Sequence, residues 1–144
     1  MSEVARALGI TSAEWDLPLV AEPVAEYATT LVGAEPEALR ALARSRASTS
    51  AIAAFARSHG ISRLWLFGSV LRPDFGPGSD IDVLVEYEPE RTPSLLGLAD
   101  HETELAAILG RPVDLVPRRG IERSENTIRR ERILGEARQL YARP

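Results

Sequence analysis

Two residue types are missing from this chain of 144 residues, and each absence excludes a kind of chemistry. It has no cysteine, which rules out disulfides and thiolate metal sites and is typical of a reducing compartment. It has no lysine, so all 17 basic side chains are arginine, and a P-loop or Schiff-base mechanism is excluded. Long apolar runs are also lacking, and the N-terminal MSEVARALGI contains Glu3. We therefore expect a cytoplasmic protein without a signal peptide or a membrane-spanning helix.

Charge is distributed unevenly along the chain, although the net charge is only −4. Residues 1–117 carry nine arginines against seventeen acidic side chains, whereas the segment from Arg118 onward carries eight arginines against four glutamates. A basic C-terminal segment therefore follows an acidic body. Its arginines form either a solvated face or a contact for an acidic partner or RNA, and the sequence leaves these alternatives open.

The first 48 residues are rich in Ala and Glu and form a predicted helical extension. Prolines divide this extension into three predicted helices, near residues 3 to 9, 23 to 32 and 36 to 46. The pattern VARALGITSAEW resembles a helix-turn-helix, but residues 1–39 contain only Arg6 against seven acidic side chains. We favour a docking arm, toward a second copy or a partner, over binding to nucleic acid.

Two short apolar runs, 64–67 and 81–85, have the length and composition of strands and are separated by a loop rich in Gly and Pro. Asp80 and Asp82 open the second run. Because side chains alternate along a strand, both carboxylates point to one face while the Ile and Val residues between and after them point to the other. Two aspartates in such a run oppose strand propensity and indicate a metal site. The alternative, a turn followed by a solvent-facing Asp82, leaves Gly68-Ser69 unexplained.

Gly68 and Ser69 end the first run. A strand that ends in Gly-Ser offers backbone N–H groups and a hydroxyl, and glycine permits the close approach of a phosphate. A third predicted strand, 113–116, would turn Asp114 to the same side as Asp80 and Asp82 if it lies beside the second. The alternative for Asp114 is an exposed position at the edge of the sheet.

The spacing of these residues resembles a known superfamily. Gly68-Ser69, ten intervening residues and Asp80-Ile81-Asp82 are similar to the signature of the DNA polymerase beta-like nucleotidyltransferases. The segments FGSVLR, SDIDVLVEY, VDLV and EARQLYA resemble, over residues 50–144, the minimal nucleotidyltransferases that act as antitoxins of HEPN-domain toxins. The resemblance implies an α/β (α+β) fold, with a small mixed sheet flanked by helices in a domain of residues 49–144.

The same resemblance implies the site. Asp80, Asp82 and Asp114 would hold two Mg²⁺ ions, and Asp114 would also take a proton as general base. The nucleotide, ATP, would be bound by Gly68, Ser69, Arg72 and Ser79. Members of the family often carry Arg directly after Gly-Ser and Gly three residues later, where this chain has Val70 and Pro73, so Arg72 is the nearest cation.

The implied function is Mg²⁺-dependent transfer of AMP from ATP to a hydroxyl, expected to be a tyrosine, of a HEPN toxin. Nucleotidyltransferases that modify small molecules add a large helical domain after the third strand, whereas about thirty residues follow it here. We therefore expect the partner to supply the acceptor. The chain is expected to form a hetero-oligomer with the toxin or a homo-oligomer. Two alternatives remain: an antitoxin that acts by binding alone, and a DNA-binding regulator that uses the N-terminal extension.

Three helices are expected in the rest of the domain. The first is capped by Thr49 or Ser50 and ends at His59-Gly60, and the second begins at Thr92-Pro93, with an apolar face, and ends at Gly110. That apolar face comprises Leu95, Leu98, Leu105, Ile108 and Leu109, so His101 is expected to meet only solvent. The third helix is expected from Ser124 to Ala142, with Ile128, Ile133, Leu134, Ala137, Leu140 and Tyr141 on its apolar side.

Overall fold

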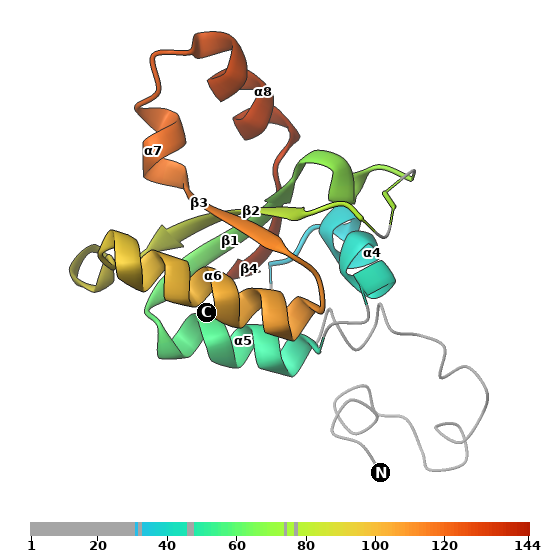
Figure 1. Cartoon of the computed structure of the whole chain (residues 1–144), viewed down its shortest axis with the longest axis horizontal. Coiled ribbons are helices and arrows are strands. Elements are labelled where there is room, and N and C mark those ends of the chain that lie inside the picture. The colour runs from blue at the N-terminus through green and yellow to red at the C-terminus, as the bar shows by residue number, and fades with distance from the viewer. Residues whose placement is uncertain (1–30, 32, 46–47, 74, 77) are drawn as a thin grey trace.

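The structure is a computed structural model that describes residues 31, 33–45, 48–73, 75–76 and 78–144. Figure 1 shows its elements with the labels used below. The helices are α4 (Pro36–Ser45), α5 (Thr49–Ser58), α6 (Leu95–Leu109), α7 (Arg118–Glu122) and α8 (Thr127–Glu136), and the strands are β1 (Ile61–Phe67), β2 (Ile81–Tyr87), β3 (Val113–Pro117) and β4 (Arg138–Ala142). Two short 3₁₀ turns, η2 (Gly68–Leu71) and η3 (Pro89–Arg91), follow β1 and β2.

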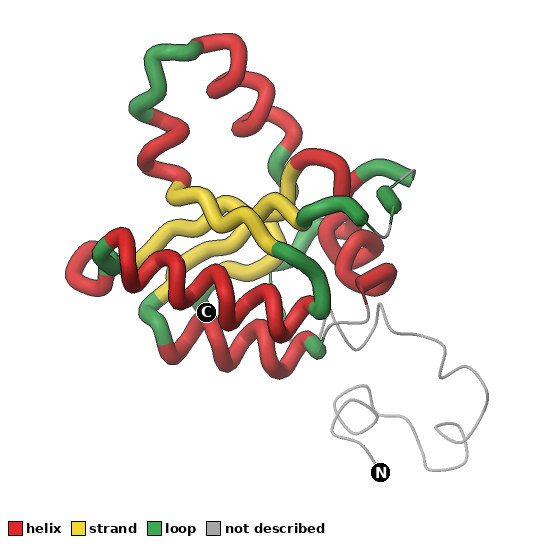
Figure 2. Tube along the Cα trace, viewed as in Figure 1, coloured by secondary structure: helices red, strands yellow, loops and turns green. Residues whose placement is uncertain are grey.

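Four strands form one mixed sheet in the order β3-β2-β1-β4. β1 runs antiparallel to both of its neighbours, whereas β2 and β3 run parallel. A parallel pair needs a long crossover connection, and α6 provides it. Figure 2 shows the strands as a layer between helices. The predicted α/β class, with a small mixed sheet flanked by helices, is confirmed.

The two faces of the sheet are covered unequally. α5 and α6 lie on one face (Figure 1), and the main core there includes Val83 and Val85 of β2. α7 and α8 lie on the other face, where a smaller cluster joins Leu84 of β2 to Ile121 and Ile133. The alternation of side chains along β2 therefore supplies both cores, and the smaller one leaves part of its face to polar residues.

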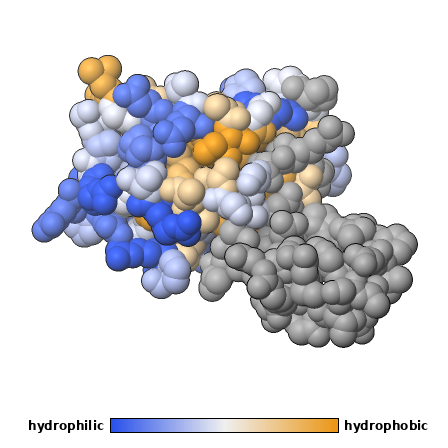
Figure 3. Space-filling view, turned by 90° about the horizontal axis from the view of Figure 1, so that it is seen from below, coloured by the Kyte–Doolittle hydropathy of each residue, from blue (hydrophilic) through white to orange (hydrophobic). Residues whose placement is uncertain are grey.

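The apolar face predicted for α6 is only partly confirmed. Leu105 and Leu109 are buried, whereas Leu95 and Leu96 in the first turn are 86% and 81% exposed. Pro93 does not begin the helix as predicted: η3 precedes it, and the Ser94 side chain caps α6 by accepting a hydrogen bond from the Gly97 N–H. Seen from below, the described surface has hydrophilic side chains on the left and a band of apolar side chains beside them (Figure 3).

The N-cap of α5 lies one residue earlier than predicted. Ser48, in extended conformation, accepts a hydrogen bond from the Ala51 N–H, so the cap is neither Thr49 nor Ser50. Thr49 is buried instead. The predicted end at His59-Gly60 is confirmed, since His59 is the C-cap and Gly60 has a φ of +67°. The first strand, β1, follows directly.

The prediction of one terminal helix from Ser124 to Ala142 is wrong. The segment forms α8, which Asn126 caps, and then the edge strand β4. β1 would otherwise leave a row of unpaired backbone groups at this edge of the sheet, and β4 satisfies them. Leu140 and Tyr141 are buried from the strand. Ile128, which was predicted to lie on the apolar side, is 80% exposed.

The predicted helix near residues 36 to 46 is confirmed as α4, while the helices near 3 to 9 and 23 to 32 lie outside the described residues apart from Leu31. α4 buries Ala38, Ala41 and Leu42 in the main core of the sheet. The Glu35 N–H donates to the Gln139 carbonyl over 2.8 Å, which ties the start of α4 to β4. The C-terminal part of the extension therefore packs on the sheet.

The two histidines lie together where α5, α6 and β2 meet. The rings of His59 and His101 are 4.0 Å apart between centroids, and His59 Nε2 is 3.1 Å from a Glu104 oxygen. Burial raises the pKa of Tyr87 to about 12, and its hydroxyl lies 2.7 Å from His101 Nδ1. Burial, and next the neighbouring His59, lower the pKa of His101. The prediction that His101 meets only solvent is therefore wrong.

Candidate functional site

Gly68 and Asp82 pack against each other at the end of β1 and the start of β2. Phe67, the last residue of β1, pairs with Asp82 in the antiparallel ladder, so the chain must turn away immediately above this carboxylate. Gly68 makes that turn with a φ of +77°, and a Cβ at this position would overlap the Asp82 Oδ2. Glycine is required here both by the left-handed backbone and by the space that the carboxylate takes.

Asp82 and Asp114 lie side by side on the parallel strands β2 and β3, where they are register partners. The neighbours Ile81 and Val83 are buried in the core beneath the opposite face, whereas Asp82 is half-buried and Asp114 is exposed. Asp80 directly precedes β2 and is exposed. The register therefore places Asp82 and Asp114 on a common face of the sheet, as predicted.

The charges of these aspartates act on one another. Burial raises the pKa of Asp82, and the negative charges of Asp114, Asp80 and Glu136 raise it further, in that order. None of the four ion pairs in the described part of the chain includes any of these carboxylates. A cluster of carboxylates without a counter-charge is an environment that favours a cation.

No group of three or more His, Asp or Glu side chains within the described ranges is arranged closely enough to enclose a metal ion. Asp80 and Asp114 are near enough to raise the pKa of Asp82, but the three carboxylates do not form a closed cage. Magnesium commonly takes one or two carboxylates together with substrate phosphates and waters, so such a cage is not required. The oxygen donors present suit Mg²⁺ and would hold it together with a nucleotide.

Glu136 is a site residue that sequence reasoning missed. It is the last residue of α8, and its Oε1 accepts a hydrogen bond from the Gly68 N–H over 3.0 Å. The two residues are 68 positions apart. The only sequence signal is an acidic residue beside Gly135 in the predicted terminal helix, and that signal does not point to Gly68.

The predicted nucleotide-binding residues occupy two places. Gly68 and Arg72 line one cleft of about 250 Å³, which Glu136 and Arg138 also line. Arg72 is exposed there, and none of the hydrogen bonds or ion pairs described for this chain uses its guanidinium. Ser69 lies in η2, where its carbonyl accepts the Arg72 N–H. The structure therefore brings Gly68 and Arg72 to one cleft.

Ser79 belongs to the loop before β2, which Arg111 anchors. The Arg111 guanidinium donates to the carbonyl of Ser79 over 3.2 Å and to that of Gly76, and it lies 4.3 Å from the Phe75 ring centroid. This contact joins the connection before β3 to the loop that leads into Asp80. Arg111 is a second residue that the sequence did not single out.

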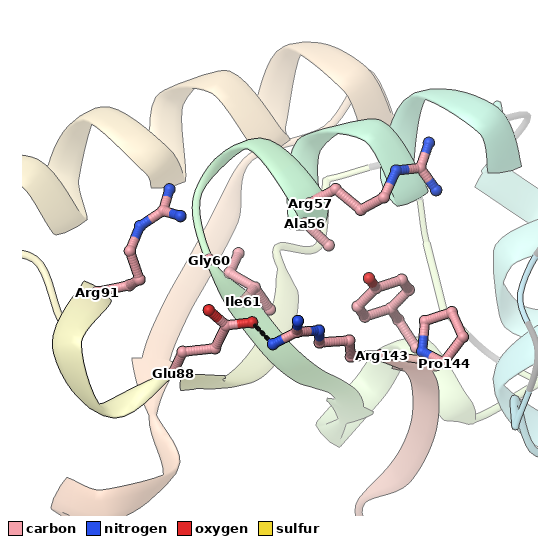
Figure 4. A pocket seen from close by; sticks show the side chains of 9 residues that line it. Ala56, Arg57, Gly60, Ile61, Glu88, Arg91, Arg143 and Pro144 are labelled. Carbon is pink, nitrogen blue, oxygen red and sulfur yellow. Dashed lines mark hydrogen bonds and ion pairs between the residues drawn. The ribbon is translucent and has the colours of Figure 1, made fainter.

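A larger cleft, of about 350 Å³, lies at the opposite end of the sheet. Arg57, Arg91 and Arg143 line it, and Arg143 forms an ion pair with Glu88 there (Figure 4). None of the predicted site residues lines this cleft. The carboxylates and the arginine-lined cleft are therefore separate features of the fold.

Residues 50–139 match the nucleotidyltransferase domain family, which is more than half of the chain and includes every predicted site residue. The chain belongs to this family. The predicted resemblance to nucleotidyltransferases is therefore confirmed. A relative from Methanocaldococcus jannaschii, provisionally named a protein adenylyltransferase, is 38% identical over 79 residues, which cover 55% of this chain and 78% of that protein.

Two further similarities concern this nucleotidyltransferase domain. The protein adenylyltransferase MntA of Thermococcus cleftensis is 42% identical over 57 residues, covering 40% of this chain and 56% of that protein. A crystal structure of a toxin–antitoxin with AMP-PNP has a TM-score of 0.52 and 25% identity, and the match covers 65% of this chain and 73% of that one.

Among the helices of the described ranges, none is long and apolar enough to cross a membrane.

Proposed function

We propose that this chain is an antitoxin that transfers AMP from ATP, with Mg²⁺, to a hydroxyl of a HEPN-domain toxin, and that the acceptor is a tyrosine. One observation carries the proposal: Asp82 lies opposite Asp114 on a parallel strand pair, with Gly68 folded directly above Asp82. Carboxylates on adjacent strands, beside a glycine that permits the close approach of a phosphate, fit phosphoryl-type transfer. The relatives named as protein adenylyltransferases support protein as the acceptor class.

Each residue has a role in this proposal. Asp80 and Asp82 would hold Mg²⁺ on the triphosphate, and all three aspartates, Asp114 included, would hold a second Mg²⁺ near the acceptor. Bound Mg²⁺ supplies charge neutralisation on the phosphates and a lowered pKa of the acceptor hydroxyl. Asp114, the more exposed of the two register partners, takes the proton of that hydroxyl. Its position at the surface leaves room for the side chain of a partner.

The transfer balances without another reactant. The acceptor oxygen forms a bond to the α-phosphorus, the bond from that phosphorus to the bridging oxygen breaks, and pyrophosphate leaves with the electron pair. Gly68 and Ser69 would hold the β- and γ-phosphates in line with the acceptor. Arg72, which lines one cleft with Gly68, would be the nearest cation. Most of the acceleration then comes from positioning and from charge stabilisation.

The deciding experiment mixes the chain with a HEPN-domain protein from the same organism, ATP and Mg²⁺, and measures the intact mass of that partner. We expect one or more added AMP units with the wild-type chain and none with Asp82→Asn. A Glu125→Gln variant, which removes an exposed charge away from the site, should modify the partner normally. A partner that remains unmodified and is nonetheless fully inhibited would establish an antitoxin that acts by binding alone.

A second measurement tests nucleotide binding without the partner. AMP-PNP with Mg²⁺ should raise the melting temperature of the wild-type chain, because a ligand that binds only the folded state stabilises it by about 2.7 kcal/mol at a hundred times its Kd. The double variant Asp80→Asn, Asp82→Asn should fold and lose this response. A response as large as that of the wild type would place the nucleotide elsewhere.

A further inference from the structure

The hydrogen bond between Glu136 and Gly68 uses a donor that the proposed function assigns to a phosphate. A backbone N–H has one hydrogen, and in this structure the hydrogen of Gly68 points to Glu136 Oε1. A carboxylate oxygen and a phosphate oxygen are both anionic acceptors of similar hydrogen-bond length. Glu136 and a nucleotide phosphate therefore cannot use the Gly68 N–H in the same way at the same time.

The charge of Glu136 adds to this conflict. It is one of the three carboxylates whose negative charge raises the pKa of Asp82, so it lies within the electrostatic field of the site. None of the ion pairs among the described residues includes Glu136. A triphosphate that reaches Gly68 would meet an unneutralised carboxylate, and like charges at contact distance repel strongly where water is partly excluded.

The same cleft offers Glu136 another place. Arg72 and Arg138 line it together with Gly68 and Glu136. Arg138 donates to the carbonyls of Gly135 and Ala137, both neutral acceptors, over 3.0 Å each. Glu136 is also the last residue of α8, directly before Ala137 in extended conformation, so its side chain stands at a junction between two elements. A Glu136 carboxylate displaced from Gly68 would therefore remain in a cleft that Arg72 and Arg138 also line.

We propose that Glu136 is a built-in competitor of the nucleotide: its carboxylate occupies the Gly68 N–H in the free chain and is displaced when the β- and γ-phosphates bind. This inference rests on the proposed function, because it names the regulation of the same site. Glu136 is a positioning residue in this scheme and lowers the affinity of the free chain for ATP. Since α8 carries Glu136, a partner that contacts α8 would change this affinity.

The test measures the Kd of AMP-PNP with Mg²⁺ by calorimetry for the full chain and three variants. Glu136→Gln keeps the shape and removes the charge, and Glu136→Ala removes the acceptor. Glu131→Gln is the matched control, since Glu131 is exposed on the same helix. We expect Glu136→Ala to bind about tenfold more tightly, the usual size of one charge-assisted hydrogen bond, and the control to bind as the wild type does. Glu136→Gln should show a smaller gain in the same direction, because its amide oxygen still accepts the Gly68 N–H.

AMP provides the readout that a merely structural role would not change. It lacks the β- and γ-phosphates, so its Kd should be the same for the wild type and the Glu136 variants, whereas the Kd of AMP-PNP falls. Weaker binding of AMP-PNP by Glu136→Gln would overturn the inference, because Glu136 would then favour nucleotide binding instead of opposing it. Equal binding by wild type and variants overturns the inference and leaves the proposed function standing. Absence of binding by all of them overturns both.

Discussion

The two ends of the sheet differ in whether their acidic side chains form ion pairs. Where β1 begins and β2 and β3 end, acidic side chains have partners: Arg63 with Glu86, Arg143 with Glu88, Arg118 with Glu122, and His59 with Glu104. Where β1 ends and β2 and β3 begin, the negative charges of Asp114, Asp80 and Glu136 add to burial in raising the pKa of Asp82, and no ion pair within the described ranges includes any of these four carboxylates.

This difference separates the paired charges from those of the candidate site. Paired charges at the first end need nothing from outside the chain, and their contribution to stability is modest because they are largely exposed. The carboxylates at the second end are costly to keep ionised together, and such a cost persists where a site is organised for a ligand. Four substitutions test this contrast, beginning with the largest expected effect.

Asp82→Asn should have opposite effects on activity and on stability. Transfer of AMP should fall by at least about 100-fold, because a ligand of both proposed ions is lost. Because the pKa of Asp82 is raised in the folded state, its ionisation destabilises the fold as pH rises above the ordinary value of about 4. The variant should therefore have a higher melting temperature than the wild type at pH 7 without ligand. A lower one would show that Asp82 is a structural charge.

Gly68→Ala should lower the free energy of unfolding by about 2 to 4 kcal/mol, because alanine is strained at a φ of +77° and its Cβ overlaps Asp82 Oδ2. Urea denaturation measures this effect. Gly135→Ala is the control, since a Cβ there meets nothing within 4 Å and replaces glycine inside α8. It should stabilise the chain by up to about 1 kcal/mol. Equal stability of the two variants would contradict the close packing of Gly68 against Asp82.

His101 should make the fold sensitive to mild acid. Its pKa is lowered in the folded state by burial and then by His59, which outweigh the opposite influence of Glu104 and Asp100. The unfolded chain therefore binds the proton first, and the free energy of unfolding should fall as pH decreases from about 7 to about 5. In urea denaturation His101→Gln should reduce this slope. A slope identical to that of the wild type would assign the sensitivity to other groups.

Arg143→Gln should have the smallest effect. It breaks the ion pair with Glu88, in which the two side chains are 62% and 28% exposed. Exposed pairs contribute about 0.2 to 1 kcal/mol and are weakened by salt, so the loss should be within that range and smaller at high ionic strength. Thermal melts at two salt concentrations measure it. A loss above about 2 kcal/mol would mean that the paired end also contains a charge on which the fold depends.

The local elements of the domain could be predicted from the sequence because their signals are short-range. The apolar runs of β1 and β2, and the alternation that sends Ile81 to one face and Asp82 to the other, involve only neighbouring residues. The ends of α5 and α6 at Gly60 and Gly110 follow from the left-handed conformation that glycine accepts. The sequence therefore determined three strands, two helices and the face on which the aspartates stand.

Tertiary structure decided the features that depend on distant partners. Residues 138–142 have a pattern compatible with a helix, yet they form β4 because the edge of β1 needs backbone partners that a helix cannot offer. Arg111 reaches Ser79, and Glu136 reaches Gly68, only after the strands between them are paired. Such contacts produce no periodic pattern in the sequence. The sequence by itself determined the face on which Asp82 and Asp114 stand, and the packing of α8 and β4 decided that Glu136 lies beside Gly68, because a hydrogen bond depends on distance in space and not along the chain.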